Sequence, residues 1–276
     1  MSISRTGPAS STSALLVFGL LFALVAPAAN GRNLQDQNAA AAPASPNPVL
    51  IELFTSEGCS SCPPADLWVQ KLDTGQPISG AQLIVLSEHV TYWDQEGWKD
   101  PNSSKALTDR QTDYKTTLGG AEVYTPQIIV DGTQELRFGN PQQIKDILVK
   151  AAATPKVPVR IVAVTVDPAN PAVLHAHIDT DPNPDKKNAD VFVAIALDHV
   201  ESQVLKGENG GKHLVHVAVV QQLTKVGKLP KGKNFSQDVQ LKLPRGADPK
   251  NVRVVAFVQE PGPGKLLGAA LHKPAI

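Results

Sequence analysis

Residues 52–66 read ELFTSEGCSSCPPAD and join an apolar run, residues 49–54 (VLIELF), to a segment with helical spacing, residues 63–72 (PPADLWVQKL). A short apolar run that ends in a Ser/Gly-rich turn is typical of a buried strand. Prolines are tolerated in the first turn of a helix, because the first amides of a helix have no intrahelical acceptor. The stretch therefore predicts a strand, a tight turn and a helix, with the chain's two cysteines, Cys59 and Cys62, at the junction.

The residues that follow continue the alternation of strands and helices up to about residue 154. We expect strands at residues 83–86, 127–130 and 134–138, and helices at residues 106–118 and 141–152. The sequence Asp131-Gly132-Thr133 between two of these strands is typical of a hairpin turn. The predicted order β-α-β-α-β-β-α indicates an α/β layer architecture.

From about residue 155 the pattern changes to short strands separated by Pro, Gly, Asn and Asp clusters. We expect seven of them, at residues 157–166, 172–178, 190–197, 213–220, 235–243, 252–259 and 266–271. This spacing is typical of a β-sandwich of the Ig-like kind. We therefore predict an α/β domain over residues 49–154, followed by a mostly antiparallel β-sandwich domain over residues 155–276.

The first 48 residues have the features of a targeting segment and a tether. Residues 14–26 (ALLVFGLLFALVA) are apolar but short for a membrane span, and Ala26-Pro27-Ala28 supplies the small residues that a signal peptidase reads. We predict a signal peptide over residues 1–28, a flexible linker over residues 29–48 and an exported protein, periplasmic or extracellular. An uncleaved membrane anchor is the alternative; after cleavage we expect no stable membrane insertion.

The charge balance narrows the classes of partner. The 276 residues contain 26 Lys+Arg and 26 Asp+Glu, so the formal net charge is zero. A neutral chain has no electrostatic reason to bind nucleic acid or an acidic membrane surface. Two cysteines also exclude a disulfide-rich scaffold.

The position of the cysteine pair indicates redox chemistry. A sulfur at a helix N-terminus faces the positive end of the helix dipole, which favours the thiolate. Cys59 is then the predicted nucleophile, and Cys62 resolves the mixed disulfide, so the pair cycles between dithiol and disulfide without a bound cofactor. We expect the partners of such a pair to be proteins or small thiols. Hydroxyls of the intervening serines would stabilise a Cys59 thiolate, whereas Glu57 would oppose it if its carboxylate lay close.

Two other interpretations of the pair stay open. Thiolates bind soft metals, so the cysteines could hold Cu(I), with His89 as a further ligand. The pair could instead form a permanent disulfide in an inert interaction module, although so small a loop restrains the unfolded chain little. Structural zinc needs four ligands, and the sequence contains one cysteine pair.

Further candidate residues lie in two segments outside the cysteine turn. Pro126 follows Thr125 at the start of a predicted strand, where a residue without an amide donor fits. A cis Thr125–Pro126 bond would turn the chain tightly beside the cysteines, and an ordinary trans proline is the alternative. His89 and Trp93 follow the second strand, at the end of the sheet where open α/β proteins bind ligands. We predict that His89, Trp93 and Thr125 contact substrate, the alternative for Trp93 being simple packing of its loop.

The same segments resemble known proteins. Cys-x-x-Cys after a strand, Thr-Pro about 60 residues later, a hairpin and a final helix look like the thioredoxin fold. In that fold the proline is cis and helps to hold the substrate backbone, which implies a catalytic-site role for Pro126. More closely, residues 52–66, 87–101 (SEHVTYWDQEGWKDP) and 123–132 (VYTPQIIVDG) are similar to the exported thioredoxin-like family known as domain of unknown function 1223. Residues 207–220 (GENGGKHLVHVAVV) resemble the second-domain signature of that family. The resemblance implies a fold and export but no substrate.

Most of the remaining chemistry-bearing side chains lie in the predicted β domain. It holds six of the seven histidines, which we interpret as scattered surface residues. His175 and His177 share one strand face by alternation, so a metal site there is the alternative. Residues 207–211 (GENGG) lack the strand-to-helix setting of a phosphate loop, and we expect a turn that contacts the first domain.

Overall fold

The computed structural model of the chain describes residues 46–185 and 187–273. The predicted signal peptide, residues 1–28, lies outside them, as does all of the predicted linker up to residue 45. The described residues belong to one compact unit.

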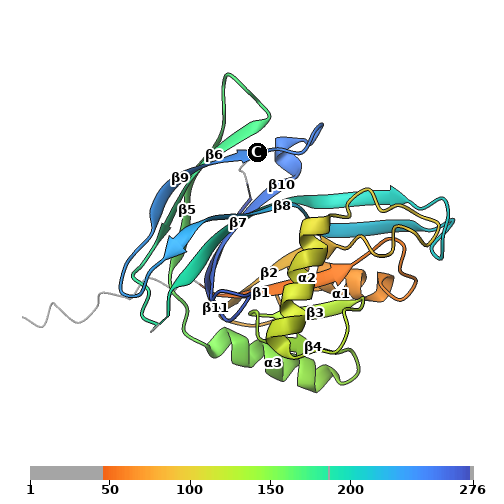
Figure 1. Ribbon diagram of the computed structural model, residues 1–276, viewed down its shortest axis with the longest axis horizontal. Coiled ribbons are helices and arrows are strands. Elements are labelled where there is room, and N and C mark those ends of the chain that lie inside the picture. Colours follow the sequence, from red (N-terminus) through yellow and green to blue (C-terminus); the bar gives the residue numbers. More distant parts are fainter. Residues whose placement is uncertain (1–45, 186, 274–276) are drawn as a thin grey trace, which may run out of the picture. The chain divides into compact units, whose positions relative to one another are not determined.

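The first half of this unit contains the predicted elements in the predicted order (Figure 1). They are β1 (Asn47–Thr55), α1 (Pro63–Gly75), β2 (Ala81–His89), α2 (Lys105–Leu118), β3 (Gln127–Val130), β4 (Gln134–Leu136) and α3 (Pro141–Ala153). Only β4 is shorter than predicted, since the chain leaves the sheet after Leu136.

The second half consists of the seven predicted strands and one short 3₁₀ turn. They are β5 (Val159–Val166), β6 (Val173–Thr180), β7 (Ala189–Gln203), β8 (His213–Leu229), β9 (Ser236–Lys242), η1 (Pro249–Asn251), β10 (Val252–Gln259) and β11 (Leu266–His272). β7 and β8 extend well beyond their predicted bounds and pair with each other as a long antiparallel hairpin.

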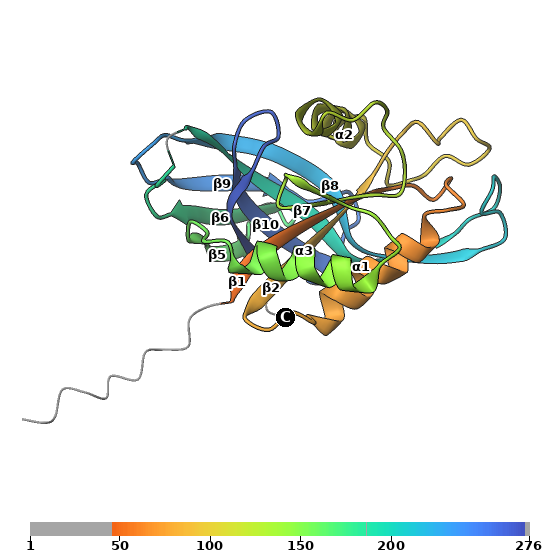
Figure 2. The same cartoon turned by 90° about the horizontal axis from the view of Figure 1, so that it is seen from below.

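The sheet topology differs from the prediction of a self-contained sandwich. One sheet of eight strands runs in the order β11-β10-β7-β8-β2-β1-β3-β4, so four strands of the second half continue the sheet of the first (Figure 2). The junction is a parallel contact between β2 and β8 at Ser87 and Val219. Without β8, β2 would be an edge strand with unpaired backbone groups. The change of pattern near residue 154 is therefore no break in the sheet, and the fold is a mixed α/β fold with a large, mostly antiparallel sheet.

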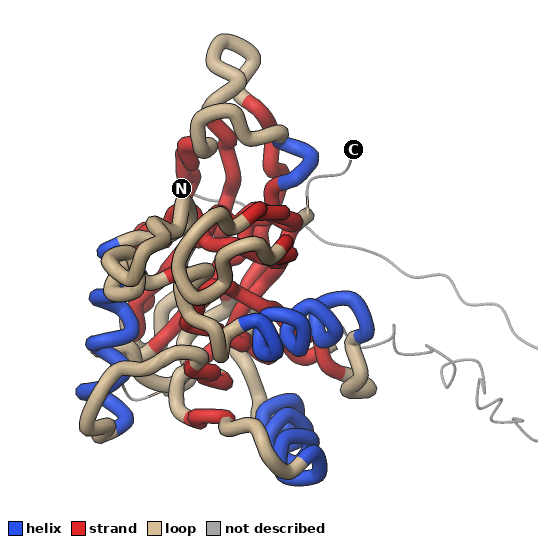
Figure 3. Tube along the Cα trace, turned by 90° about the vertical axis from the view of Figure 1, so that its right-hand side faces the viewer, coloured by secondary structure: helices blue, strands red, loops and turns tan. Residues whose placement is uncertain are grey.

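The remaining strands and the helices form layers on this sheet. β5, β6 and β9 make a separate antiparallel sheet that shares one apolar core with β7 and β10. Alternate residues of β1 point to opposite faces, as expected for a strand. Ile51 and Leu53 pack with α1 and α3, whereas Phe54 packs with Tyr114 of α2. Figure 3 shows the three long helices in the lower part of the view and the strand-rich half above them.

Candidate functional site

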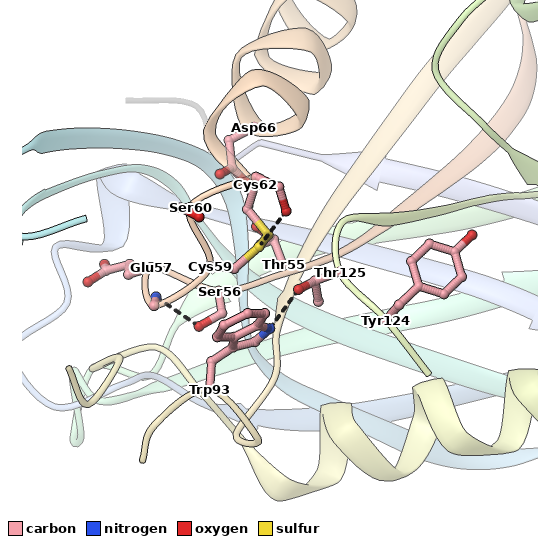
Figure 4. Close-up of a disulfide and its surroundings, with 12 residues drawn as sticks. Thr55, Ser56, Glu57, Cys59, Ser60, Cys62, Asp66, Trp93, Tyr124 and Thr125 are labelled. Carbon is pink, nitrogen blue, oxygen red and sulfur yellow. Dashed lines mark hydrogen bonds between the residues drawn. A yellow bond between two sulfur atoms is a disulfide. The ribbon is translucent and has the colours of Figure 1, made fainter. Parts of the chain in front are cut away.

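A disulfide joins Cys59 and Cys62 at the start of α1 (Figure 4). Cys62 is the N-cap residue, and its carbonyl accepts hydrogen bonds from the amides of Ala65 and Asp66, at 2.8 and 3.1 Å. The predicted strand-to-helix junction is thus confirmed. Both cysteines are fully buried.

The turn around Cys59 is held by its own serines. The Cys59 amide donates to the Ser56 carbonyl at 3.2 Å, and the Gly58 amide donates to Ser56 Oγ at 3.1 Å. Ser61 Oγ lies 3.3 Å from Cys59 Sγ, so a hydroxyl is available to this sulfur as expected. Ser60 and Ser61 are themselves exposed.

A loop from the second half of the chain is hydrogen-bonded to this turn. We call residues 204–212, between β7 and β8, the capping loop. Asn209 Nδ2 donates to the carbonyls of Glu57 and Cys59, at 2.8 and 2.9 Å. Glu208 Oε2 accepts a hydrogen bond from the Ser60 amide at 3.1 Å. The expected contact of residues 207–211 with the first half of the chain is therefore confirmed.

Trp93 lies between the cysteine turn and Thr125 (Figure 4). Its Nε1 donates to Thr125 Oγ1 at 2.7 Å, and a Cβ added to Gly58 would lie 3.1 Å from Trp93 Cβ. The Thr125–Pro126 bond is cis. The structure thus brings the predicted residues Trp93 and Thr125 to the cysteine turn.

His89 is placed differently from Trp93. It is fully buried, and its Nδ1 lies 2.7 Å from Asp100 Oδ2, so it does not line an open substrate groove as we predicted. Burial disfavours the charged imidazole, but the adjacent Asp100 carboxylate outweighs it and raises the pKa of His89. Burial likewise opposes ionisation of Asp100, yet the His89 charge and two backbone amides lower the pKa of Asp100 to about 2. The two side chains form a buried ion pair.

A second buried histidine, His216 of β8, lies beside His89. The ring centroids are 4.8 Å apart. His216 Nδ1 lies 3.6 Å from Asp66 Oδ1, and Nε2 lies 3.9 Å from Glu57 Oε1. Among the described residues, no hydrogen-bond partner is found for either nitrogen of His216, for His89 Nε2 or for Asp66 Oδ2. Buried polar atoms normally have partners, so this buried polar cluster next to the cysteine turn is unusual for a protein interior.

We predicted His216 to be a surface residue, so this cluster was not expected from the sequence. The signal was available in β8, where Leu214 and His216 occupy alternate positions that face the interior while His213 is exposed. The carboxylates could not be assigned to it from the sequence, since Glu57 and Asp66 come from segments about 150 residues away. Glu57 itself accepts a hydrogen bond from Trp98 Nε1 at 2.7 Å.

A further buried ionic cluster lies against α2. Arg110 Nε donates to Glu52 Oε1 at 2.6 Å, and Tyr114 Oη donates to the other oxygen of the same carboxylate. Arg110 also donates to Gln259 Oε1 of β10 at 3.0 Å. Burial and the neighbouring Glu52 charge raise the pKa of Glu88 well above its ordinary value. The cluster ties α2 to both halves of the chain.

The other candidate groups do not assemble into a metal site. His175 Nε2 pairs with Asp167 at 2.9 Å and His177 Nδ1 with Asp238 at 2.7 Å, so each imidazole has its own carboxylate. Over residues 46–185 and 187–273, no group of three or more His, Cys, Asp or Glu side chains is arranged to hold a metal ion. In the same residues no helix is long and apolar enough to cross a membrane.

Comparisons with known proteins give a family and a structural neighbour. The crystal structure of protein AGR_C_4864 from Agrobacterium tumefaciens is similar, with 27% identity and a TM-score of 0.63, covering 83% of this chain and 96% of that one. A domain of the outer membrane lipoprotein Omp28 from Porphyromonas gingivalis has a TM-score of 0.27 and 14% identity, over 43% of this chain and 88% of its own. No curated protein matches the chain.

The family comparison covers most of the structure described above. The family described as "Protein of unknown function (DUF1223)" matches residues 50–259, a span that includes the cysteine turn, the Thr125–Pro126 bond and the capping loop. Because the match extends over more than half of the 276 residues, the chain belongs to the DUF1223 family.

Proposed function

We propose that this chain is an exported, thioredoxin-like protein that exchanges thiols and disulfides through Cys59 and Cys62. The observation that carries the proposal is the disulfide between these cysteines at the N-terminus of α1, directly after β1. A cysteine pair in this position favours thiolate formation by the attacking sulfur once the disulfide is reduced.

The topology of the first half supports the thioredoxin-like part of the proposal. Its strands lie in the order β2-β1-β3-β4, with β1 parallel to β2 and antiparallel to β3. α1 and α3 pack on one face and α2 on the other. Thr125 and Pro126 lie at the start of β3, where the resemblance implies that they contact the backbone of a substrate.

The proposed reaction transfers two electrons in two displacements. In the reduced protein, the Cys59 thiolate attacks a substrate disulfide, forms a mixed disulfide and releases one substrate thiolate. The Cys62 thiolate then attacks Cys59 Sγ, which closes the Cys59–Cys62 bond and releases the second substrate thiolate. The substrate gains the two electrons that the cysteine pair loses, and its thiolates take up protons from water.

A permanent structural disulfide is the second candidate. It is favoured by one specific observation, the complete burial of both cysteines. An exchanging disulfide has to expose a sulfur to an attacking thiolate, whereas a structural one does not. The reduction potential separates the two candidates, because structural disulfides have potentials below about −300 mV.

A trapping experiment tests the exchange function. Cys62→Ser removes the resolving thiol, so a mixed disulfide on Cys59 should accumulate in the compartment to which the protein is exported. Cys59→Ser is the matched control, because it leaves the buried sulfur and removes the nucleophile. Absence of Cys59-linked partners, under conditions that trap a known oxidoreductase, would contradict the proposed function.

Export is tested separately. We expect the mature protein to begin after Ala28 or Ala29, since residues 26–28 supply the small residues that signal peptidase requires. The intact mass of the protein recovered from the periplasm or medium measures the cleavage site. A full-length chain that stays with the membrane would support the uncleaved anchor instead.

A further inference from the structure

The capping loop is attached to the cysteine turn at only a few points. Within residues 204–212 only Val204 and Asn209 are buried, and the other residues are exposed. Asn209 is the main attachment, because its side-chain amide donates to the carbonyls of Glu57 and Cys59 on either side of Gly58. Lys212 Nζ donates to Asn209 Oδ1 at 2.8 Å and so fixes the orientation of this amide.

Two further contacts hold the loop against the first half of the chain. Gly207 has a φ of +72° and lies so close to residues 96–98 that an added Cβ would be 3.0 Å from the Glu96 carbonyl oxygen. The Glu208 carboxylate accepts a hydrogen bond from the amide of Ser60, the residue next to Cys59. The Glu208 carboxylate is exposed, so water can replace this bond readily.

We propose that the capping loop is a lid on the redox pair and that Asn209 is the positioning residue that sets how readily the lid opens. This inference deepens the proposed exchange function. Cys59 is fully buried while the loop holds its carbonyl and the amide that follows it. An attacking thiolate needs a free approach to Cys59 Sγ along the disulfide bond, so the turn must be released before exchange. Opening breaks the two Asn209 hydrogen bonds and leaves the sheet intact, since β7 and β8 remain paired up to Gln203 and His213.

The rate of reduction by dithiothreitol tests the lid without any protein partner. A dithiothreitol thiolate attacks Cys59 Sγ and displaces Cys62, which takes up a proton. The second dithiothreitol sulfur then displaces Cys59, so the reagent closes to its cyclic disulfide and the protein gains two electrons. Alkylation of the freed thiols followed by mass spectrometry gives the rate.

We expect Asn209→Ala to raise this rate about 10- to 30-fold, because the closed state loses two hydrogen bonds and the loop opens more often. Gly207→Ala should raise it too, through a different contact, and it keeps the test valid if Asn209→Ala does not fold. Asn183→Ala is the matched control. Asn183 is also buried and donates to two backbone carbonyls, those of Lys187 and Leu229, but these carbonyls belong to the β6–β7 loop and to β8, not to the cysteine turn.

The outcomes separate the lid from the exchange function. Faster reduction of the Asn209 and Gly207 variants, with the Asn183 variant unchanged, supports the lid even if no protein partner is trapped through Cys59. Equal rates in wild type, Asn209→Ala and Gly207→Ala overturn it, whether or not a partner is found. An equal acceleration in Asn183→Ala also overturns it, since general loosening of the fold would then explain the effect.

Discussion

Asp100 provides the sharpest test of how the buried polar residues next to the cysteine turn contribute to stability. Its carboxylate accepts hydrogen bonds from the amides of Glu57 and Asn102, at 2.9 and 2.8 Å, and pairs with His89 Nδ1 at 2.7 Å. Asp100→Ala removes all three interactions at once. It leaves a buried amide and a buried imidazole nitrogen without an acceptor.

The size of the loss follows from this burial. Breaking a buried ion pair by removing one partner costs about 3 to 5 kcal/mol of unfolding free energy. We expect the lower end of that range, because in the Asp100→Ala variant the imidazole of His89 can lose its proton at little cost near neutral pH. For a unit of this size, a loss of ~3 kcal/mol lowers Tm by about 6 to 12 °C.

The pH dependence follows from the two pKa shifts. The pKa of Asp100 lies below its ordinary 3.8, so its contribution is present above pH 3.8 and is lost as the pH falls towards 2. The pKa of His89 lies above its ordinary 6.5, so its contribution is full below pH 6.5 and is lost as the pH rises through the folded-state value. The difference between wild type and Asp100→Ala in urea unfolding should therefore be largest between pH 4 and 6.5.

The chain contains a matched control for this prediction. Asp167 also accepts hydrogen bonds from two backbone amides, those of Ala169 and Asn170, and pairs with a histidine, His175, at 2.9 Å. Asp167 and His175 are partly exposed, so solvent replaces the lost partners and Asp167→Ala should cost much less. Equal losses in the two variants, or a loss at Asp100 that does not change between pH 3 and 8, would contradict this prediction.

Three further predictions concern other buried contacts. Glu88→Gln replaces a carboxyl whose pKa is raised well above its ordinary 4.5 with an amide that does not titrate. Since a raised carboxyl pKa costs stability as the pH rises from the unfolded-state value through the folded-state value, wild type should lose stability relative to the variant as the pH rises above 4.5 in urea unfolding; an equal pH dependence of the two proteins would contradict this. Arg253→Met leaves the buried Asp73 carboxylate without the two hydrogen bonds that Arg253 donates, at 2.7 and 2.9 Å. The free energy of unfolding, measured by chemical unfolding, should fall by about 3 to 5 kcal/mol, and a loss below about 1 kcal/mol would count against this prediction. Trp93→Phe and Thr125→Val should each cost about 1 kcal/mol, and the double variant should cost less than their sum, because both remove the same hydrogen bond.

The local features of the cysteine turn could be predicted from the sequence, because residues close to it in the chain determine them. The apolar run before Cys59 predicted β1, and Pro63 and Pro64 predicted the start of α1, as observed. Asp131-Gly132 predicted the hairpin between β3 and β4, which the structure also contains. Each of these depends on backbone preferences within a few residues.

The residues that contact the cysteine turn could not be predicted in the same way. His216 and Asn209 come from the second half of the chain. The residue type alone, His or Asn, does not predict which residues the side chain will contact. Their positions depend on β8 lying against β2, a pairing between strands that are more than 120 residues apart. Apolar alternation predicts which face of β8 is buried. It does not predict which strand β8 will pair with, because any edge strand with the same buried face could pair with it.

Side-chain periodicity and local backbone preference are enough to predict the order of strands and helices and the position of the two cysteines at a helix start. Long-range packing, in contrast, joins the two halves in one sheet, brings His89 and His216 together among buried carboxylates, and lets Asn209 hold the turn of Cys59. These outcomes depend on long-range packing, in which burial changes the pKa of a carboxyl or imidazole and the accessibility of a sulfur without any change in the sequence around it.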